Sequence, residues 1–305
     1  MKLYYADHFV LPLPPGHRFP MEKYSRLRAR LVASGVFGDG DLREPAAATD
    51  AELARAHDPA YVARVAQGEL AADEIRRIGF PWSEAMVERS RRSAGATLAA
   101  CRSALDEGCG INLAGGTHHA HREFGSGFCV FNDAAVAALA MRAEGRVQRV
   151  AVVDCDVHQG DGTAAILAGV PEVFTCSLHG AKNFPFRKAR SDLDVELPDD
   201  TGDEPYLAAL DNALERVFSE FRPQLLIYLA GADPYAGDRL GRLALSKQGL
   251  AERDRRVLAR CHASGLPVAI AMAGGYASEI DDTVDIHYRT VLTAAGLFHR
   301  PAGVR

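Results

Sequence analysis

The sequence predicts an α/β protein of three layers, in which helices cover both faces of a central, mainly parallel sheet. Four runs of apolar, often β-branched residues are bounded by Gly, Pro or Asp, as buried parallel strands are: 150–154, 173–177, 225–229 and 268–272. Helical patterns alternate with these runs. Ligands of such sheets bind beyond the carboxyl ends of the strands, so the residues after each run should indicate the function.

The helices follow from amphipathic spacing and from N-capping residues such as Asn132. Five are expected, at residues 83–106, 132–144, 204–221, 247–264 and 281–298. The alternation has no internal repeat, and the only linker-like stretch, Glu44–Thr49, is too short to separate domains. We therefore expect a single domain over residues 1–305.

Composition narrows the class of protein. With 48% hydrophobic and 25% charged residues, the chain has the make-up of a soluble globular protein. A net charge of −5 offers no general reason to bind nucleic acid or an anionic membrane. The six cysteines form no Cys-x-x-Cys pair, and no segment reaches the roughly 18 apolar residues of a membrane span. The first twenty residues lack the apolar run of a signal peptide. We expect a reduced, cytoplasmic protein; no feature indicates its oligomeric state.

Three of the predicted strands end in residues that can bind a metal or carry chemistry. Asp156 and His158 follow the first strand and point to the same side, because side chains alternate along an extended chain. Asp233 follows a later strand and can supply a third ligand. Two carboxylates and one imidazole form a catalytic zinc site that acidifies a bound water, and the same donors suit ferrous iron. An isolated Asp-x-His would more often be a solvated loop, but three converging strand ends argue against that interpretation.

The stretch Gly-Gly-Thr-His-His-Ala-His contains a tandem pair, His118 and His119. If both were ligands as well, the metal would have no position left for substrate. A hydrolase also needs a proton acceptor and a donor to the leaving amine, and two histidines oriented by aspartates meet that need. Asp154 and Asp161 are the remaining carboxylates of the cluster. A polar loop is the alternative, and we expect His121 to be structural or exposed.

These residues, in this order, resemble the zinc-dependent histone deacetylase family. The matching segments are Gly115–Ala120, Gly125–Asp133, Asp154–Gly162, Gly231–Asp233 and Gly274–Tyr276. The resemblance runs from about residue 16 to residue 276. Residues 17–24 and 78–83 are most similar to the bacterial, class IV-like branch. The resemblance implies the arginase/deacetylase-like fold, with the active site at the carboxyl ends of the strands.

The resemblance also implies a role for each matching residue of the active site. His119 matches the general base and acid, with His118 as its electrostatic partner, and Asp154 and Asp161 match the aspartates bonded to His118 and His119, respectively. Tyr276 matches the tyrosine that polarises the scissile carbonyl and stabilises the oxyanion. The zinc ligands of the family match Asp156, His158 and Asp233.

Substrate and potassium sites are implied in the same way. Gly127 and Phe128 match the wall of the tunnel that holds the lysine stem, and Arg18 matches an arginine of the exit channel for the acyl product. Leu240 stands at the tunnel rim, where polyamine-specific relatives carry an acidic residue. A structural K⁺ is implied at Asp154, at the backbone of Asp156 and His158, and at Ser177 and Leu178.

The implied activity is that of a zinc-dependent amidohydrolase that removes acetyl or other acyl groups from the ε-amine of lysine in a protein or peptide. Deacetylation of acetylpolyamines or another small N-acyl amine is the alternative, which Leu240 and the absence of a long N-terminal insertion disfavour. An arginase-like ureohydrolase needs an Asp-x-Asp pair where residues 232–234 read Ala-Asp-Pro. A non-catalytic acyl-lysine binder would not need Tyr276 or the proton-handling histidines. Gln159, a histidine in many relatives, should have little effect.

Overall fold

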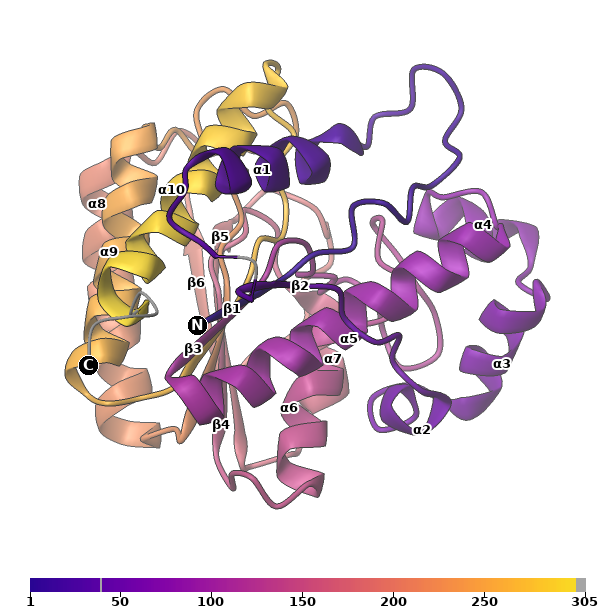
Figure 1. The fold of residues 1–305 in the computed structure, drawn as a ribbon, viewed down its shortest axis with the longest axis horizontal. Helices are drawn as coiled ribbons and strands as arrows, with labels where there is room; N and C mark the ends of the chain where they lie inside the picture. The colour runs from indigo at the N-terminus through magenta and orange to yellow at the C-terminus, as the bar shows by residue number, and fades with distance from the viewer. Residues whose placement is uncertain (39, 300–305) are drawn as a thin grey trace.

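One eight-stranded sheet forms the centre of the computed structural model, which describes residues 1–38 and 40–299 (Figure 1). Position 39 and the last six residues of the predicted domain, 300–305, lie outside the described residues. Every strand pair in the sheet is parallel, as the sequence predicted, and the order is β2-β1-β3-β8-β7-β4-β5-β6. The strands are β1 (Lys2–Tyr4), β2 (Leu42–Arg43), β3 (Cys109–Asn112), β4 (Val150–Asp154), β5 (Val173–Gly180), β6 (Leu193–Leu197), β7 (Leu225–Leu229) and β8 (Val268–Ala271).

The four predicted strands are all present. The bounds of β4 and β7 are those predicted, while β5 continues to Gly180 and β8 ends one residue early, at Ala271. The other four strands were not predicted. They are short, or, like β6 with its sequence Leu-Asp-Val-Glu-Leu, lie at the sheet edge and carry charges, so no buried apolar run marks them.

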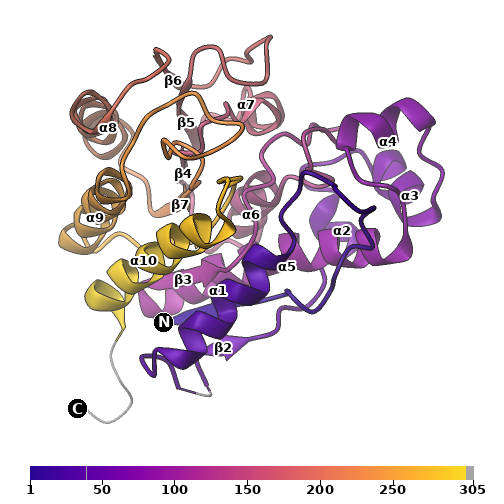
Figure 2. The same cartoon turned by 90° about the horizontal axis from the view of Figure 1, so that it is seen from above.

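Helices cover both faces of the sheet (Figure 2), which confirms the three-layer prediction. On one side lie α1, α8, α9 and α10, and on the other α5, α6 and α7, with the short helices α2 to α4 beyond α5. The helices are α1 (Glu22–Ala33), α2 (Asp50–Leu53), α3 (Pro59–Gln67), α4 (Ala72–Ile78), α5 (Glu84–Glu107), α6 (Asp133–Ala143), α7 (Asp161–Leu167), α8 (Asp203–Arg216), α9 (Lys247–Ala263) and α10 (Ile280–Phe298).

One predicted helix is divided. The segment 204–221 is α-helical only to Arg216 and continues as a π-helix, η1 (Val217–Phe221). Arg222 then adopts a left-handed backbone with φ of 55°, which ends the helix just before β7. The predicted helix over 132–144 is α6, and the Asn132 side chain accepts a hydrogen bond from the Ala135 amide, as expected of an N-cap.

Two apolar cores hold the layers together. One lies between the sheet and α8, α9 and α10, and the other between the sheet and α5 and α6. Strand residues contribute alternately to the two cores: Val153 faces the first and Val152 the second. All six cysteines are buried free thiols. Across the described residues, we find no helix with the length and hydropathy of a transmembrane span.

The strand order explains where polar residues gather. Strands β3, β8, β7 and β4 are neighbours, and their last residues stand in register: Asn112 opposite Ala271, Ala271 opposite Leu229, and Leu229 opposite Asp154. The segments that leave these strands therefore begin side by side along one edge. Together with Asp154, the last residue of β4, they contain every residue that the sequence suggested for the metal and for proton transfer.

Candidate active site

A cavity of about 870 Å³ opens at the carboxyl ends of the strands. Its lining combines the tandem histidines, the three candidate metal ligands, Tyr276 and the candidate substrate residues, all of which the sequence singled out. Arg18 and Leu240 lie in the lining as well. The structure thus brings together residues that lie up to about 260 positions apart in the chain, from Arg18 to Tyr276.

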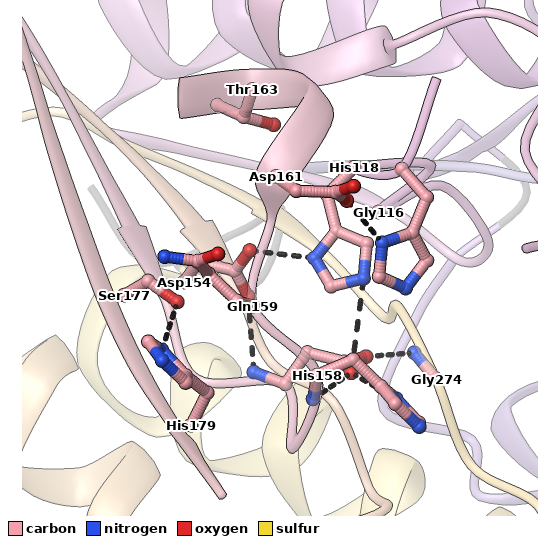
Figure 3. Close-up of polar contacts among 12 residues, drawn as sticks. Gly116, His118, Asp154, His158, Gln159, Asp161, Thr163, Ser177, His179 and Gly274 are labelled. Carbon is pink, nitrogen blue, oxygen red and sulfur yellow. Dashed lines mark hydrogen bonds and ion pairs between the residues drawn. The ribbon is translucent and has the colours of Figure 1, made fainter. Parts of the chain in front are cut away.

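Asp156, His158 and Asp233 offer one ligand atom each, and these atoms lie within 4.8 Å of one another. The His158 Nδ1 is 3.0 Å from Asp156 Oδ1 and 3.3 Å from Asp233 Oδ2. Backbone amides hold the carboxylates in place. Val157 donates to Asp233 Oδ1 at 2.9 Å. Gly274, labelled in Figure 3, donates to Asp156 Oδ2 at 2.8 Å.

This cluster fits a divalent cation. Among the described residues, the buried Asp233 Oδ2 accepts no well-formed hydrogen bond, and its neighbour at 3.3 Å, His158 Nδ1, is itself a candidate ligand atom. Burial, and then the charge of Asp156, raise the pKa of Asp233 to about 7. The ligand oxygens of Asp156 and Asp233 lie within 4.8 Å of each other. Two buried carboxylates this close repel each other unless a proton or a cation lies between them. Asp/His donors with a free oxygen suit zinc or ferrous iron.

Gly274 leaves the space that the cluster needs. A Cβ at this position would lie 2.0 Å from Asp233 Oδ2 and 2.5 Å from Asp156 Oδ2. Any side chain would therefore displace the two carboxylates. The sequence showed a Gly-Gly pair here, but only the structure shows that one of the two glycines gives room to the candidate ligands.

The segment that carries His118 and His119 is fixed by the start of α6. The Asp133 carboxylate accepts hydrogen bonds from the amides of Gly116, at 2.9 Å, and Thr117, at 2.7 Å. The Asn132 amide group donates to the carbonyl of His118 at 3.2 Å. The Asn-Asp pair therefore holds the backbone before and after the histidines, and both rings point towards the candidate metal site.

Each of the two histidines is bonded to an aspartate, in the pairing that the resemblance implied. His118 Nδ1 is 2.6 Å from Asp154 Oδ2 (Figure 3), and His119 Nδ1 is 2.6 Å from Asp161 Oδ1. His121 is not free: its Nε2 lies 3.1 Å from Asp161 Oδ2. The sequence suggested no partner for His121; in the structure it is half-buried and holds the second oxygen of the aspartate that binds His119.

The two histidines differ in their protonation. Burial lowers the pKa of His119, and the charge of His118 lowers it further, to about 4, in spite of the bond to Asp161. Burial also opposes the charged form of His118, but Asp154 and Asp156 outweigh it and raise the pKa to about 9. These surroundings favour the neutral imidazole at His119 and the cationic form at His118.

Hydrogen bonds to its backbone hold Tyr276 in position. Its amide donates to Asp238 Oδ2 at 2.5 Å, and Arg239 Nε donates to its carbonyl at 3.0 Å. Burial raises the pKa of the Tyr276 hydroxyl well above its ordinary value, so the hydroxyl remains a hydrogen-bond donor.

Lys23 is a residue of this site to which sequence reasoning gave no role. Its ammonium group is buried and donates to the carbonyls of Ala273 and Gly275, at 3.3 Å each. It also lies 5.2 Å from the centroid of the Tyr276 ring. Lys23 thus ties α1 to the segment that carries Tyr276. Its position inside the motif of residues 17–24 was the only signal in the sequence.

Aromatic residues form the apolar wall of the cavity. Phe128 has a left-handed backbone with φ of 66°, and its amide donates to the carbonyl of Ile78 at 2.7 Å. The neighbouring Gly127 packs so closely that a Cβ would lie 2.7 Å from the His119 ring. Phe184, which was not predicted, lies edge-on to the His119 ring at 4.9 Å between centroids. An aromatic pair after a strand, Phe184 and Phe186, was the available signal for this second wall.

The implied potassium ligands lie on adjacent strands. Asp154 of β4 stands opposite Ser177 of β5, with Leu178 next to it. The Ser177 hydroxyl is 3.0 Å from His179 Nδ1 (Figure 3). Gln159 bonds to the carbonyl of Ala189 at 2.9 Å and is not part of the candidate metal cluster.

The strand ends of this all-parallel sheet hold an Asp/His cluster beside two aspartate-bonded histidines, an arrangement that can support hydrolysis assisted by a metal ion. The family model of the histone deacetylase domain matches residues 17–291. The chain belongs to the histone deacetylase family.

Relatives support this membership along nearly the whole chain. A histone deacetylase-like amidohydrolase of Pseudomonas aeruginosa is 32% identical, over 87% of this chain and 74% of that protein. Histone deacetylase 2 of Arabidopsis thaliana is 31% identical, over 85% of this chain and 70% of its own length. An uncharacterized protein of Picosynechococcus sp. is 44% identical, over 98% of this chain and 97% of its own. The solved HDA15 HD domain has the same fold, with a TM-score of 0.82 at 23% identity, over 99% of this chain and 90% of that one.

Proposed function

We propose that this protein is a zinc-dependent deacylase that removes acetyl or other acyl groups from the ε-amine of lysine. The observation that carries the proposal is the convergence, in one cavity, of the cluster of Asp156, His158 and Asp233 with a neutral His119 and the hydroxyl of Tyr276. In addition to a metal site, amide hydrolysis needs a base, an acid for the leaving amine and an oxyanion donor. We infer that a single domain contains all of them.

The metal site would be formed by Asp156, His158 and Asp233. A bound zinc ion would supply Lewis-acid chemistry, since it would polarise the acyl carbonyl and acidify the attacking water. Ferrous iron fits the same donors.

His119 acts as the general base in this proposal. Its Nδ1 faces Asp161, so the hydrogen of the neutral ring lies on Nδ1 and Nε2 is free to accept a proton from the attacking water. The Asp161 carboxylate then stabilises the imidazolium, which returns the proton to the leaving amine. His118 stays protonated and adds positive charge beside the reacting atoms.

Tyr276 donates its hydroxyl hydrogen to the developing oxyanion. Asp238 and Lys23 position the segment that carries this residue. Phe128, Gly127 and Phe184 enclose the uncharged stem of the acylated side chain. Leu240 and Arg18 also line the cavity, and Arg18, which the resemblance implied for the exit channel, is exposed at its surface. We further propose that a K⁺ ion bound by Asp154, Ser177 and their neighbours stabilises the turn that carries the metal ligands.

The test is hydrolysis of an acetyl-lysine peptide by protein that has been stripped with a chelator and reloaded with Zn²⁺. Mass spectrometry detects the product, the same peptide without its acetyl group. We expect turnover only in the reloaded sample, and inhibition by a hydroxamate. A panel that adds longer acyl groups and acetylpolyamines identifies the preferred substrate. A protein that hydrolyses acetylpolyamines and no lysine peptide would overturn the proposal in favour of the small-amine alternative.

The matched variants are Tyr276→Phe and Tyr288→Phe. Each removes one phenol hydroxyl, but Tyr288 lies on α10, outside the cavity lining. Tyr276→Phe should fold normally and lose about 10²- to 10³-fold in kcat, the usual loss for one oxyanion donor. Tyr288→Phe should retain activity. Full activity of Tyr276→Phe would remove this residue from the mechanism.

A further inference from the structure

The mouth of the cavity is surrounded by exposed basic side chains, which we call the cationic rim. They come from the segment before α1, from the end of α4, and from the segments that follow β5 and β7. The cationic rim consists of Arg18, Arg76, Arg77, Lys182, Arg239 and Arg242. The only carboxylates in the described lining of the cavity are Asp156 and Asp233, which are buried and belong to the metal cluster.

Few carboxylates neutralise the cationic rim. Asp199 lies 3.1 Å from Arg242 and 3.5 Å from Lys182, and Asp73 is 3.8 Å from Arg77. The other three members, Arg18, Arg76 and Arg239, have no carboxylate oxygen within 4.0 Å among residues 1–38 and 40–299. The chain as a whole carries a net charge of −5, so the positive charge at the mouth is a local feature and not a consequence of composition.

An exposed aromatic side chain lies beside these cations. Phe186 is 86% exposed, far more than any other large apolar residue described as exposed. It lines the cavity and stands edge-on to Phe184, with 6.2 Å between ring centroids. Exposed aromatic and arginine side chains are the residues that protein-binding surfaces favour. The mouth therefore offers one apolar contact within a positively charged surround.

We propose that the cationic rim selects acyl-lysines whose neighbouring residues are Asp or Glu. The inference rests on the proposed function, because it concerns the chain that flanks the acylated side chain while that side chain occupies the cavity. The residues that enclose the stem, Gly127, Phe128 and Phe184, contact only its uncharged part. Charged residues of the substrate are therefore recognised only at the mouth of the cavity. The same charges repel a substrate whose leaving group is a polyamine, which strengthens the choice of acyl-lysine.

Electrostatics set the form of the expected selectivity. The cationic rim is exposed, so its attraction for acidic residues falls with ionic strength, because the Debye length shrinks from about 10 Å at 0.1 M salt to about 3 Å at 1 M. It acts on encounter and binding and not on the reacting atoms, so kcat/KM should change and kcat should not. At low salt, we expect a gain in kcat/KM of about tenfold for acidic over neutral flanks.

The experiment compares three peptides that share one acetyl-lysine and have Asp, Asn or Lys at the flanking positions. The wild-type protein should prefer them in that order at low salt, and the differences should shrink at 0.5 M salt, an ionic strength at which charges more than about 5 Å apart are screened. The double substitution Arg76→Glu and Arg77→Glu leaves four cations and two carboxylates at the rim, so the preference for the Asp peptide should be largely lost. Both side chains are exposed at the end of α4, so the exchange leaves the core intact.

Arg149→Glu is the matched control. Arg149 is exposed and precedes β4, so it lies at the opposite edge of the sheet, about 17 Å from the carboxyl end of that strand. It should leave the order of the peptides unchanged. Equal kcat/KM for the three peptides, or a preference for Lys flanks, would overturn the proposal. So would a loss in the double variant that is the same for every peptide.

Binding separates this inference from the proposed function. Fluorescence anisotropy of labelled versions of the same peptides measures affinity, and the Tyr276→Phe variant, with its low kcat, keeps turnover small during the titration. If no peptide is hydrolysed, the proposed function fails, while tighter binding of the Asp peptide that is lost in the double variant still supports the cationic rim. Hydrolysis of all three peptides with equal affinities gives the reverse result: the function stands and the cationic rim does not select.

Discussion

Exchange of Asp161 for asparagine tests the proposed proton transfer most directly. The Asp161 Oδ1 lies 2.6 Å from His119 Nδ1, and the two side chains are 12% and 6% exposed. Asparagine has the same shape and can bond to His119 and His121 at once, so the arrangement should survive. The negative charge is lost. When His119 accepts a proton in the variant, the imidazolium has no counter-charge beside it.

The contact distance sets the size of the effect. Two unit charges 2.6 Å apart attract each other by about 6 kcal/mol at an effective dielectric constant of about 20. The bond to the asparagine amide restores about 1 kcal/mol, and reorganisation around the new cation reduces the difference further. We expect kcat to fall about 10²- to 10³-fold, which corresponds to about 3–4 kcal/mol in the barrier.

The assay is steady-state hydrolysis of an acetyl-lysine peptide, with thermal unfolding and metal content measured on the same samples. KM and metal content should stay close to those of the wild type. The control is His121→Gln, which alters only the second contact of Asp161, at 3.1 Å, and should cost no more than a few-fold. Near-native kcat in Asp161→Asn would refute the role of His119 as the base. Equal losses in both variants would show that the aspartate merely supports the loop.

Three further predictions concern the metal cluster, stability and Tyr276. Gly274→Ala places a Cβ 2.0 Å from a carboxylate oxygen of the cluster, so it should lose bound metal by elemental analysis, whereas Gly296→Ala, with open space around it, should not. Burial lowers the pKa of His57 to about 4, so the unfolded chain binds more protons below pH 6.5. The free energy of unfolding should therefore fall as the pH drops from 6.5 to 4, by up to about 3 kcal/mol. In His57→Gln, the free energy of unfolding, measured by urea titrations at each pH, should depend less steeply on pH. Lys23→Met removes the bonds that hold the segment of Tyr276, so kcat should drop about tenfold with KM nearly unchanged; an unaltered kcat in the folded variant would exclude this positioning role.

Local pattern was enough to predict the fold class and the candidate metal cluster. Strands β4 and β7 appear as uninterrupted apolar runs because both faces of a parallel strand are buried, and their bounds were predicted without error. Asp156, His158 and Asp233 could be grouped because parallel strands end along one edge, where charged residues need a cation. The strands and the candidate metal ligands could both be predicted because the residues that indicate them lie in a strand or within a few positions after it.

Other features depend on contacts between distant parts of the chain. Lys23 meets the carbonyls of residues 250 and 252 positions away, and no local pattern indicates that pairing. The bond between His121 and Asp161 and the second aromatic wall at Phe184, which follows β5, also arise only when β3, β8, β7, β4 and β5 are set side by side.

The sequence by itself determined which segments form buried strands and which polar residues follow them, because apolar runs and backbone periodicity are local properties of the chain. Only the tertiary structure decided which histidine is neutral and which is charged. That difference comes from burial and from neighbouring charges: His119 lies beside the cationic His118, and His118 lies between Asp154 and Asp156. The cationic rim is a tertiary feature for the same reason. Its arginines and lysine come from four separate segments, and they form one charged mouth only because the fold brings the ends of those segments around the cavity.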